Sequence, residues 1–510
     1  MDKQGVKLAA ALLGATALVA PQAVLARQGH GHALKHAAAA KSKHEVELEA
    51  RLARLEAEVA EMHAAAMQAK GARTEADAGA QVALAQAQAQ AAAASASAQV
   101  AAAKATETAT RLAALEKKPA PEGMRSGATT IKLGGYLKLE AANSHFSNGP
   151  VTTNTLGRDF YLPSTIPTTV GGHPATSTDF SAKQARFWLN LETQVSGHTV
   201  KGYVEADFQV TASAVQNVTG GGSQRTTNGY TLGLRRAFMT VDRFTLGQDW
   251  TTFQYVAALP ESTDYVGPTE GTVFVRQPQV RYSAPLSKNA VLHVAIENPE
   301  SALTTAGSPT LAENGTDRMP DLTARLVLTG AHGELSLAGL LRQVRAESTG
   351  SALTNAGAGL TATGIGGSVA GKFWLNKDKT ADLRFMATYG QNIGRYVGLN
   401  FAPDAIYLPT TNTLSDVKVF AAMTALHLPL TAKTRVNLMA GIQNVSYDAA
   451  LTAAQNGTFN KKAWSLAANL FYSPVKPIDL GIEYRHGERD LVNGASGTLD
   501  RVELAAKYSF

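Results

Sequence analysis

The chain has 510 residues, no cysteine, a formal net charge of +6 and only 17% charged residues. Without cysteine it cannot be held by disulfides, and a positive charge spread this thinly favours anions but excludes a typical nucleic-acid-binding protein. No apolar run after residue 26 reaches the roughly 18 residues that a membrane-spanning helix needs, so any membrane role must use strands.

Residues 1–26 are predicted to be a cleaved secretory signal peptide. Two lysines precede an apolar run, and "AVLA" offers small residues before a cleavage site. The following segment, 27–44, contains several histidines and lysines, and we interpret it as a flexible tail. Its histidines could bind a metal, but no cysteine or carboxylate accompanies them to fix a geometry, so no metal and no cofactor are predicted.

The segment 45–116 is predicted to form a coiled coil that continues into an Ala-rich helix. Its first part, "ELEARLARLEAEVAEMH", repeats apolar residues at spacings of four and three, the heptad seam of helices that pair with copies of themselves. The seam residues are Leu48, Leu52, Leu55, Val59 and Met62. The alternative is a lone amphipathic or partly disordered linker, because the alanine that follows binds weakly in core positions. The stretch "KKPAPEG" then ends the helix and opens a linker over residues 117–128.

Residues 129–510 are predicted to form a succession of strands. Segments such as "IKLGGYLKLE" and "ARFWLNLETQ" alternate polar and apolar residues, which is the period of a strand with two unlike faces. Alternation alone does not say which face lies inside. A soluble sandwich buries its apolar face, whereas a membrane barrel turns that face to lipid.

The connections between the strands favour the barrel. Short turns such as "SGHT", "VDR" and "PLSKN" alternate regularly with long loops, and the strands number about 16. Bacterial outer-membrane barrels have an even number of strands, short periplasmic turns and long outer loops. We therefore predict an all-β transmembrane antiparallel barrel of about 16 strands, preceded by an N-terminal α-helical coiled coil that lies in the periplasm.

The last ten residues, "RVELAAKYSF", form a predicted strand with one apolar and one polar face. Because a membrane barrel can leave no edge open to lipid, this strand is expected to close the barrel against the first. Tyr508 and Phe510 are predicted to be an assembly signal, since the terminal Phe resembles the C-terminal aromatic that the barrel assembly machinery recognises in porins.

Four segments, "LGGYLKLE", "YVEADF", "LRRAFMTVDRFTLGQDWTTF" and "GTVFVRQPQVRY", resemble the DcaP-like porins, trimeric outer-membrane channels for small anionic solutes such as dicarboxylates. The resemblance implies a homotrimer in the outer membrane of a Gram-negative bacterium. Its partners would be outer-membrane lipid, the barrel assembly machinery and small anions, with peptidoglycan as a partner of the coiled coil. It implies passive diffusion through a water-filled channel, no enzyme activity and no nucleic-acid binding.

The residues that select solutes are expected beside the third long loop, which in porins folds back into the lumen. This loop, 250–274, carries the predicted constriction acids Glu261, Asp264 and Glu270. Arginines on the flanking strands and elsewhere in the polar phase are the predicted anion-selective residues: Arg235, Arg276 and Arg281, then Lys138, Arg186 and Arg384. The alternative is that they are ordinary wall charges paired with nearby acids.

The phase of the strand that carries Arg235 and Arg236 separates these two neighbours. If Leu232 and Leu234 face lipid, Arg235 faces the lumen, and Arg236 cannot do so unless a bulge resets the phase. Pro278 predicts a second irregularity, which would let Arg276 point inward.

Two other classes of function remain open from the sequence. One is an adhesin whose coiled coil acts outside the cell and whose barrel is an anchor. The other is a barrel hydrolase that takes Ser and His from separate strands, although the sequence contains neither a GxSxG elbow nor an HExxH helix.

Overall fold

The computed structural model describes residues 123–153, 155–210, 229–313, 316–347 and 359–510, with scattered positions between 51 and 90. The chain divides into two compact units, Met1–Thr110 and Arg111–Phe510. In the first unit, Val59 and Met62 are helical and exposed. The predicted signal peptide, the tail 27–44 and the seam residues Leu48, Leu52 and Leu55 lie outside the described residues. No described helix is long and apolar enough to span a membrane.

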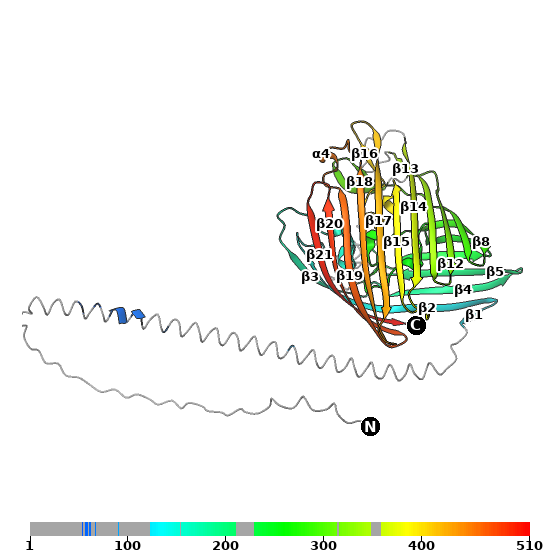
Figure 1. Cartoon of the computed structure of the whole chain (residues 1–510), viewed down its shortest axis with the longest axis horizontal. Coiled ribbons are helices and arrows are strands. Elements are labelled where there is room, and N and C mark those ends of the chain that lie inside the picture. Colours follow the sequence, from blue (N-terminus) through cyan, green and yellow to red (C-terminus); the bar gives the residue numbers. More distant parts are fainter. Residues whose placement is uncertain are drawn as a thin grey trace, which may run out of the picture. The chain divides into compact units, whose positions relative to one another are not determined.

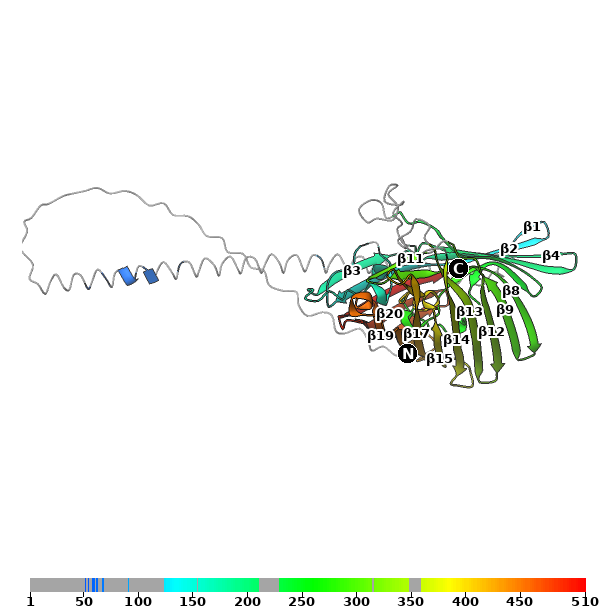
Figure 2. The same cartoon turned by 90° about the horizontal axis from the view of Figure 1, so that it is seen from above.

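The second unit is a closed barrel of sixteen antiparallel strands, as predicted (Figures 1 and 2). Each strand pairs with its neighbours in the sequence, and the last pairs with the first. The barrel strands are β2 (Thr129–Phe146), β4 (Arg186–Val195), β5 (His198–Asp207), β6 (Gly233–Val241), β7 (Phe244–Trp250), β8 (Arg276–Ser287), β9 (Ala290–Glu297), β12 (Asp321–Gly330), β13 (Gly333–Ala346), β14 (Leu360–Trp374), β15 (Asp382–Gln391), β17 (Thr413–Pro429), β18 (Thr434–Tyr447), β19 (Asn460–Val475), β20 (Ile478–Leu491) and β21 (Ser496–Ser509).

Five shorter strands complete the sheet: β1 (Met124–Ser126), β3 (Ala175–Ser181), β10 (Ala302–Thr305), β11 (Ser308–Glu313) and β16 (Ala405–Leu408). The strand β1 pairs with the start of β2, so strand pairing begins inside the segment predicted as a linker. The second barrel strand is interrupted. The C-terminal half of β2 pairs with β3, and its N-terminal half pairs with β4.

Short turns and long loops alternate around the barrel as the sequence predicts. Two-residue turns join β4 to β5 and β6 to β7, whereas β7 and β8 are 25 residues apart. The long loops carry the short helical turns α2 (Leu156–Asp159), η1 (Pro163–Thr165), η2 (Val256–Ala258), η3 (Thr269–Gly271), η4 (Gly394–Tyr396) and α4 (Ala453–Asn456). Figure 1 shows β16 and α4 at the long-loop end of the barrel and the C-terminus at the opposite end.

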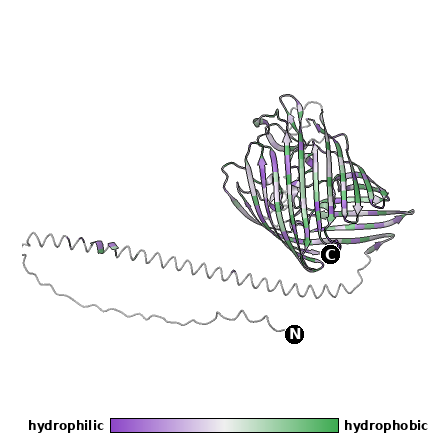
Figure 3. Cartoon of the chain, viewed as in Figure 1, coloured by the Kyte–Doolittle hydropathy of each residue, from purple (hydrophilic) through white to green (hydrophobic). Residues whose placement is uncertain are grey.

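The alternation of the strands sorts side chains between lipid and lumen. On β2 the side chains of Leu137 and Leu139 are 61% and 54% exposed and point outward, whereas Glu140 is 3% exposed and points inward. Hydrophobic and hydrophilic positions alternate along the strands in Figure 3. The apolar exterior and polar lumen are those of a membrane barrel and not of a soluble sandwich.

The closing seam between β2 and β21 is continuous to the last residue. Gly135 and Phe510 exchange backbone hydrogen bonds of 3.1 and 3.0 Å. Gly135 is required by space, because a Cβ there would lie 2.6 Å from the Arg186 carbonyl oxygen and 2.7 Å from the Phe510 ring. The predicted closure of the barrel by the terminal strand is therefore confirmed.

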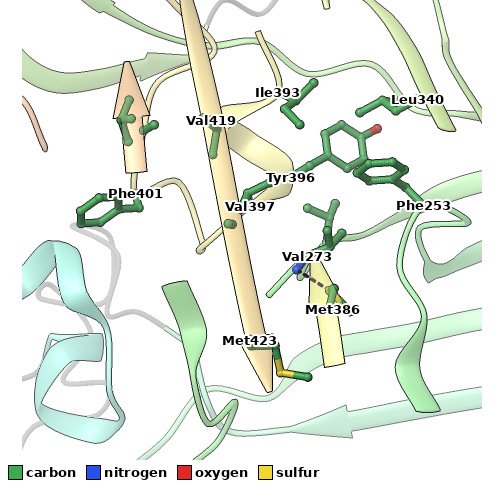
Figure 4. Close-up of a cluster of buried hydrophobic side chains, with 14 of the residues drawn as sticks. Phe253, Val273, Leu340, Met386, Ile393, Tyr396, Val397, Phe401, Val419 and Met423 are labelled. Carbon is green, nitrogen blue, oxygen red and sulfur yellow. Dashed lines mark hydrogen bonds between the residues drawn. The ribbon is translucent and has the colours of Figure 1, made fainter. Parts of the chain in front are cut away.

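The loop between β7 and β8, residues 251–275, folds into the barrel and is called L3 below. Its helical turns contact the wall formed by β14, β15, β17, β18 and β19. Phe253 and Val273 of L3 enter a buried cluster with residues of the wall and of the loop after β15 (Figure 4). The rings of Phe253 and Tyr396 meet edge to face at 5.9 Å, and the amide of Val273 lies 3.4 Å from the sulfur of Met386. Apolar packing therefore fixes one side of L3 against one wall.

Glycine allows the backbone of L3 to approach this wall closely. A Cβ at Gly271 would collide with the carbonyl oxygen of Ala422 on β17. A Cβ at Gly441 on β18 would lie 2.5 Å from the carboxylate of Glu270. The two absent side chains provide the space in which η3 is seated.

The three acids of L3 also turn toward the protein wall. Glu261 pairs with Arg435 of β18 at 2.6 Å, and Asp264 accepts the backbone amide of Tyr161 at 3.2 Å. The hydroxyl of Ser465 on β19 donates to Glu270 at 2.6 Å. Each acid thus has a partner on the wall or on the first loop.

These contacts set the charge state of the L3 acids. Burial by itself raises the pKa of the Glu261 carboxyl, but the hydrogen bonds and the charge of Arg435 outweigh it and hold the pKa below its usual range. For the Glu270 carboxyl, burial dominates and raises the pKa. Of the two, Glu261 therefore keeps its negative charge, and its bond to the wall, to lower pH.

Two predicted selectivity residues hold the backbone of L3. The ammonium of Lys138 donates to the carbonyl of Thr263 at 2.5 Å, and Arg384 donates to the carbonyl of Leu259 at 2.6 Å. Each is also neutralised by an acid, Glu140 for Lys138 and Asp382 for Arg384. Their geometry is that of loop anchors.

We expect Gly135→Ala to lower the temperature at which the folded barrel unfolds in detergent, because the new methyl group collides with the backbone of β4 on one side and with the Phe510 ring at the seam on the other. The matched control is Gly339→Ala on β13, where a Cβ meets nothing within 4 Å. That change should leave the unfolding temperature unchanged or slightly higher, since glycine loses more backbone entropy on folding. The measurement is the loss of the compact, SDS-resistant band on heating. Equal shifts for both variants would contradict the assigned seam.

We expect Glu261→Gln to loosen the middle of L3 without unfolding the barrel, because Arg435 retains its 3.0 Å bond to Asp479. A hydrogen bond to a charged group is worth about 1.5–3 kcal/mol, which predicts roughly 10- to 100-fold faster amide exchange for residues 262–265. Hydrogen exchange read by mass spectrometry measures this. Glu192→Gln makes the same chemical change on β4 and should leave those amides unaffected. Unchanged exchange in Glu261→Gln would mean that apolar packing and the Lys138 and Arg384 hydrogen bonds hold the loop without Glu261.

Candidate functional site

Beside L3, six arginines project from every second strand of the wall, and we call this set the arginine ladder. The members are Arg186 on β4, Arg235 and Arg236 on β6, Arg276 and Arg281 on β8, and Arg325 on β12. Acids occupy the strands between them: Glu205 and Asp207 on β5, Asp249 on β7 and Glu297 on β9. Cationic and acidic strands thus alternate along the wall, an arrangement in which cross-strand neighbours attract.

A bulge in β6 brings two consecutive arginines to the lumen. Glu205 of β5 pairs with Arg236 and the next residue, Ala206, pairs with Leu234, so Arg235 is the extra residue. The Nε of Arg235 donates to Asp207 at 2.6 Å, and that of Arg236 donates to Asp249 at 2.6 Å. The lumen position predicted for Arg235 holds. For Arg236 the stated exception applies, because the bulge resets the phase and brings it to the lumen as well.

Four members of the ladder are tied to carboxylates. Arg186 contacts Glu205 at 2.8 Å and Asp207 at 2.6 Å, and Arg281 contacts Asp249 at 2.8 Å. Arg235 and Arg281, two of the three arginines expected to select anions, are therefore paired. The neighbouring carboxylates therefore largely neutralise the positive charge of these two arginines.

Arg276 has an aromatic environment instead. Its guanidinium lies over the ring of Trp250 at 3.7 Å and near that of Phe274 at 5.1 Å. The register between β7 and β8 runs past Pro278 without a shift, so the irregularity predicted there was wrong, and Arg276 stands in the strand phase of Val280. Its guanidinium nevertheless lies against Phe274, which belongs to the buried cluster of L3 that includes Tyr265. No carboxylate among the described residues pairs with Arg276, and its Nε is buried without a partner.

Arg325 is the second member without an acid among the described residues, and the sequence analysis did not select it. Its guanidinium donates to the backbone carbonyl of Gln254 in L3, and its Nε is buried without a partner. The signal was present in the alternation of "DLTARLVLTG", which puts Arg325 in the polar phase of β12 with Thr323. The nearest acidic strand offers Glu297, but Thr252, Gln277 and Thr323 already donate to that carboxylate.

Tyr265 of L3 sits against the middle of the ladder. Its ring lies 5.4 Å from Arg186 and 5.7 Å from Arg235, and its hydroxyl donates to Asp207 at 3.2 Å. A tyrosine ring attracts cations without contributing a full negative charge, so it orders the guanidinium groups and leaves them positive.

The arrangement can attract anions. In the part of the chain that the structure describes, no group of His, Asp and Glu side chains could hold a metal ion. Guanidinium groups bind carboxylates through two parallel hydrogen bonds, and the donors of Arg276 and Arg325 are not saturated by protein acids. The ladder is thus a positive wall in contact with a loop whose acids bind elsewhere.

Comparison with known proteins agrees with this architecture. The outer membrane channel DcaP of Acinetobacter baumannii is 26% identical with a TM-score of 0.60, over 76% of this chain and 99% of that one. OmpT of Vibrio cholerae and an anion-selective porin from Comamonas acidovorans are each 11% identical, with TM-scores of 0.45 and 0.43. OmpT covers 76% of this chain and the Comamonas porin 75%, each over the whole of its own length, and neither bears on selectivity here. No curated protein matches the chain.

The family comparison extends beyond the barrel. The family model of the DcaP outer membrane protein matches residues 67–510, which include the whole barrel and part of the segment before it. Together with the closed barrel, this match indicates a channel and not an enzyme. The chain belongs to the DcaP outer membrane protein family.

Proposed function

We propose that this outer-membrane porin passes small anions in preference to cations, and that the unpaired arginines of the ladder provide the preference. The observation that carries the proposal is that Arg276 and Arg325 have no carboxylate partner among the described residues, while Glu261, Asp264 and Glu270 are engaged elsewhere. An anion passing the ladder would meet a net positive wall.

The size of the effect follows from Coulomb's law. A positive charge about 6 Å from a passing anion is worth roughly 0.7 kcal/mol at the dielectric of water, or about threefold in occupancy. Two such charges give about tenfold, and a dicarboxylate gains about twice the energy of a monoanion. For this reason we propose dicarboxylate-like solutes over neutral sugars.

We expect Arg276→Gln and Arg325→Gln each to lower anion occupancy about threefold, and the double variant about tenfold, and to lower the anion-to-cation permeability ratio by at least these factors, because the same charges repel cations. The measurement is the zero-current potential of the reconstituted protein across a salt gradient. The preference should also fade as ionic strength rises, because the Debye length falls from about 8 Å at physiological salt to about 3 Å at 1 M.

Arg243→Gln is the control for this experiment. Arg243 lies in the turn between β6 and β7, where it donates to the hydroxyl of Tyr282, so its loss removes the same charge away from the ladder. It should leave the potential unchanged. Cation preference in the wild-type protein, or a double variant with the wild-type potential, would contradict the proposal.

We further propose that the porin is a homotrimer whose N-terminal segment extends into the periplasm. The heptad seam provides a reason for self-association, and both ends of a sixteen-stranded chain emerge on the periplasmic side. The outer-membrane lipid, the assembly machinery and peptidoglycan remain the proposed partners of the barrel and of the helix.

We expect native mass measurement of detergent-purified protein to give three chains per particle. A variant that lacks residues 27–122 separates the two sources of association: a trimer would show that the barrel walls suffice, and monomers would assign the assembly to the seam. A monomeric full-length protein would contradict the proposed trimer.

A further inference from the structure

A polar cavity lies at the long-loop end of the barrel, and we call it the mouth pocket. It encloses about 290 Å³ between the β10–β11 hairpin, the loop after η4, and the ends of β18, β19 and β20. It shares no lining residue with the arginine ladder. Its volume is at the lower end of the range for ligand pockets, which suits a small solute.

The charged group of the mouth pocket is Arg489 on β20. Its Nε donates to the side-chain oxygen of Asn460 at 2.8 Å, and its Nη1 donates to the backbone carbonyl of Ile166 at 2.8 Å. These two neutral acceptors fix the plane of the guanidinium without neutralising it. Within the described ranges no carboxylate forms an ion pair with Arg489, and Nη2 has no hydrogen-bond partner.

Two further polar groups of the pocket lack partners. Thr304 of β10 is 2% exposed, and its hydroxyl has no hydrogen-bond partner among the described residues. The side-chain oxygen of Asn400 is also buried and unpartnered there. A buried polar group without a partner is costly, and both of these groups line the same cavity as Arg489.

The backbone that carries Asn400 is strained. Gly398, Leu399 and Asn400 all have φ values between +53° and +62°, a left-handed conformation that glycine and asparagine tolerate but leucine avoids. Such conformations persist where surrounding structure imposes them, and they concentrate at ligand sites. The strained turn therefore presents Asn400 to the cavity at a conformational cost.

We propose that the mouth pocket binds a small monocarboxylate that carries a hydroxyl or amino group. One uncompensated guanidinium matches one carboxylate, with the Thr304 hydroxyl as a second donor. The oxygen of Asn400 accepts a hydrogen bond, so the ligand must supply a donor of its own. Phe401 and Leu311 provide apolar wall for a short hydrocarbon part.

The mouth pocket would hold this solute before it reaches the ladder. Its place at the long-loop end puts Arg489 where a solute enters from outside. The proposal rests on the chain being a porin but not on the proposed preference for anions at the ladder, because the two sites have no residue in common.

The test measures block of chloride current through the reconstituted full-length porin by lactate added on the long-loop side at constant ionic strength. Propionate, which lacks the hydroxyl, is the matched probe. The wild-type protein should show saturable block by lactate at lower concentration than by propionate. Arg489→Gln should weaken block by both probes about tenfold or more. Asn400→Gly, which keeps the left-handed backbone without strain, should weaken block by lactate only.

Lys461→Gln is the control, because it removes one positive charge beside Asn460 and leaves the mouth pocket intact. It should retain wild-type block, and Arg489→Lys shows whether charge without the fixed guanidinium suffices. Lys461→Gln and Asn400→Gly should keep the wild-type zero-current potential, and the ladder variants should keep the lactate block. Absence of saturable block in the wild-type protein would overturn the proposal, as would block in Arg489→Gln equal to wild type. A change of ion preference in the ladder variants tests only the proposed function and not the mouth pocket.

Discussion

Inside a lipid bilayer every backbone amide and carbonyl must find its partner within the protein, and the seam between β2 and β21 meets this demand at the point where the two ends of the barrel meet. The pairing continues to Phe510, whose backbone bonds to Gly135. Once the sheet is closed, alternation leaves one face for lipid and one for the lumen. The lumen can then hold charged side chains, because water and other side chains solvate them there.

L3 contacts two parts of the barrel wall that differ in charge. One wall receives the apolar side of the loop and binds its acids, with Arg435 holding Glu261 and Ser465 holding Glu270. The other wall carries the arginine ladder, where more guanidinium groups than available carboxylates are present. Charge separation across the lumen therefore depends on how L3 folds as much as on which residues the strands carry.

The sequence predicted most of the arginines in the ladder, but it did not predict which carboxylates pair with them. Arg235, Arg276, Arg281 and Arg186 were all selected, and all lie in the ladder. Their partners on β5 and β7 are near in space but not near in sequence, and only cross-strand register shows that Asp249 reaches both Arg236 and Arg281. Arg325 was missed for the same reason, because its place beside L3 is a contact between distant parts of the chain.

What the sequence by itself determined is the barrel: its strand period, the rhythm of turns and loops, and the closing strand that ends in Phe510. These are local patterns, and a two-residue period needs no knowledge of distant contacts. Only the tertiary structure decided which charges stay unpaired, because that depends on the bulge at Arg235 and on the path of L3. It also turned Lys138 and Arg384 into anchors of L3 and brought Thr304, Asn400 and Arg489 together around one cavity. Such groupings join residues separated by up to 185 positions, and no local pattern encodes them.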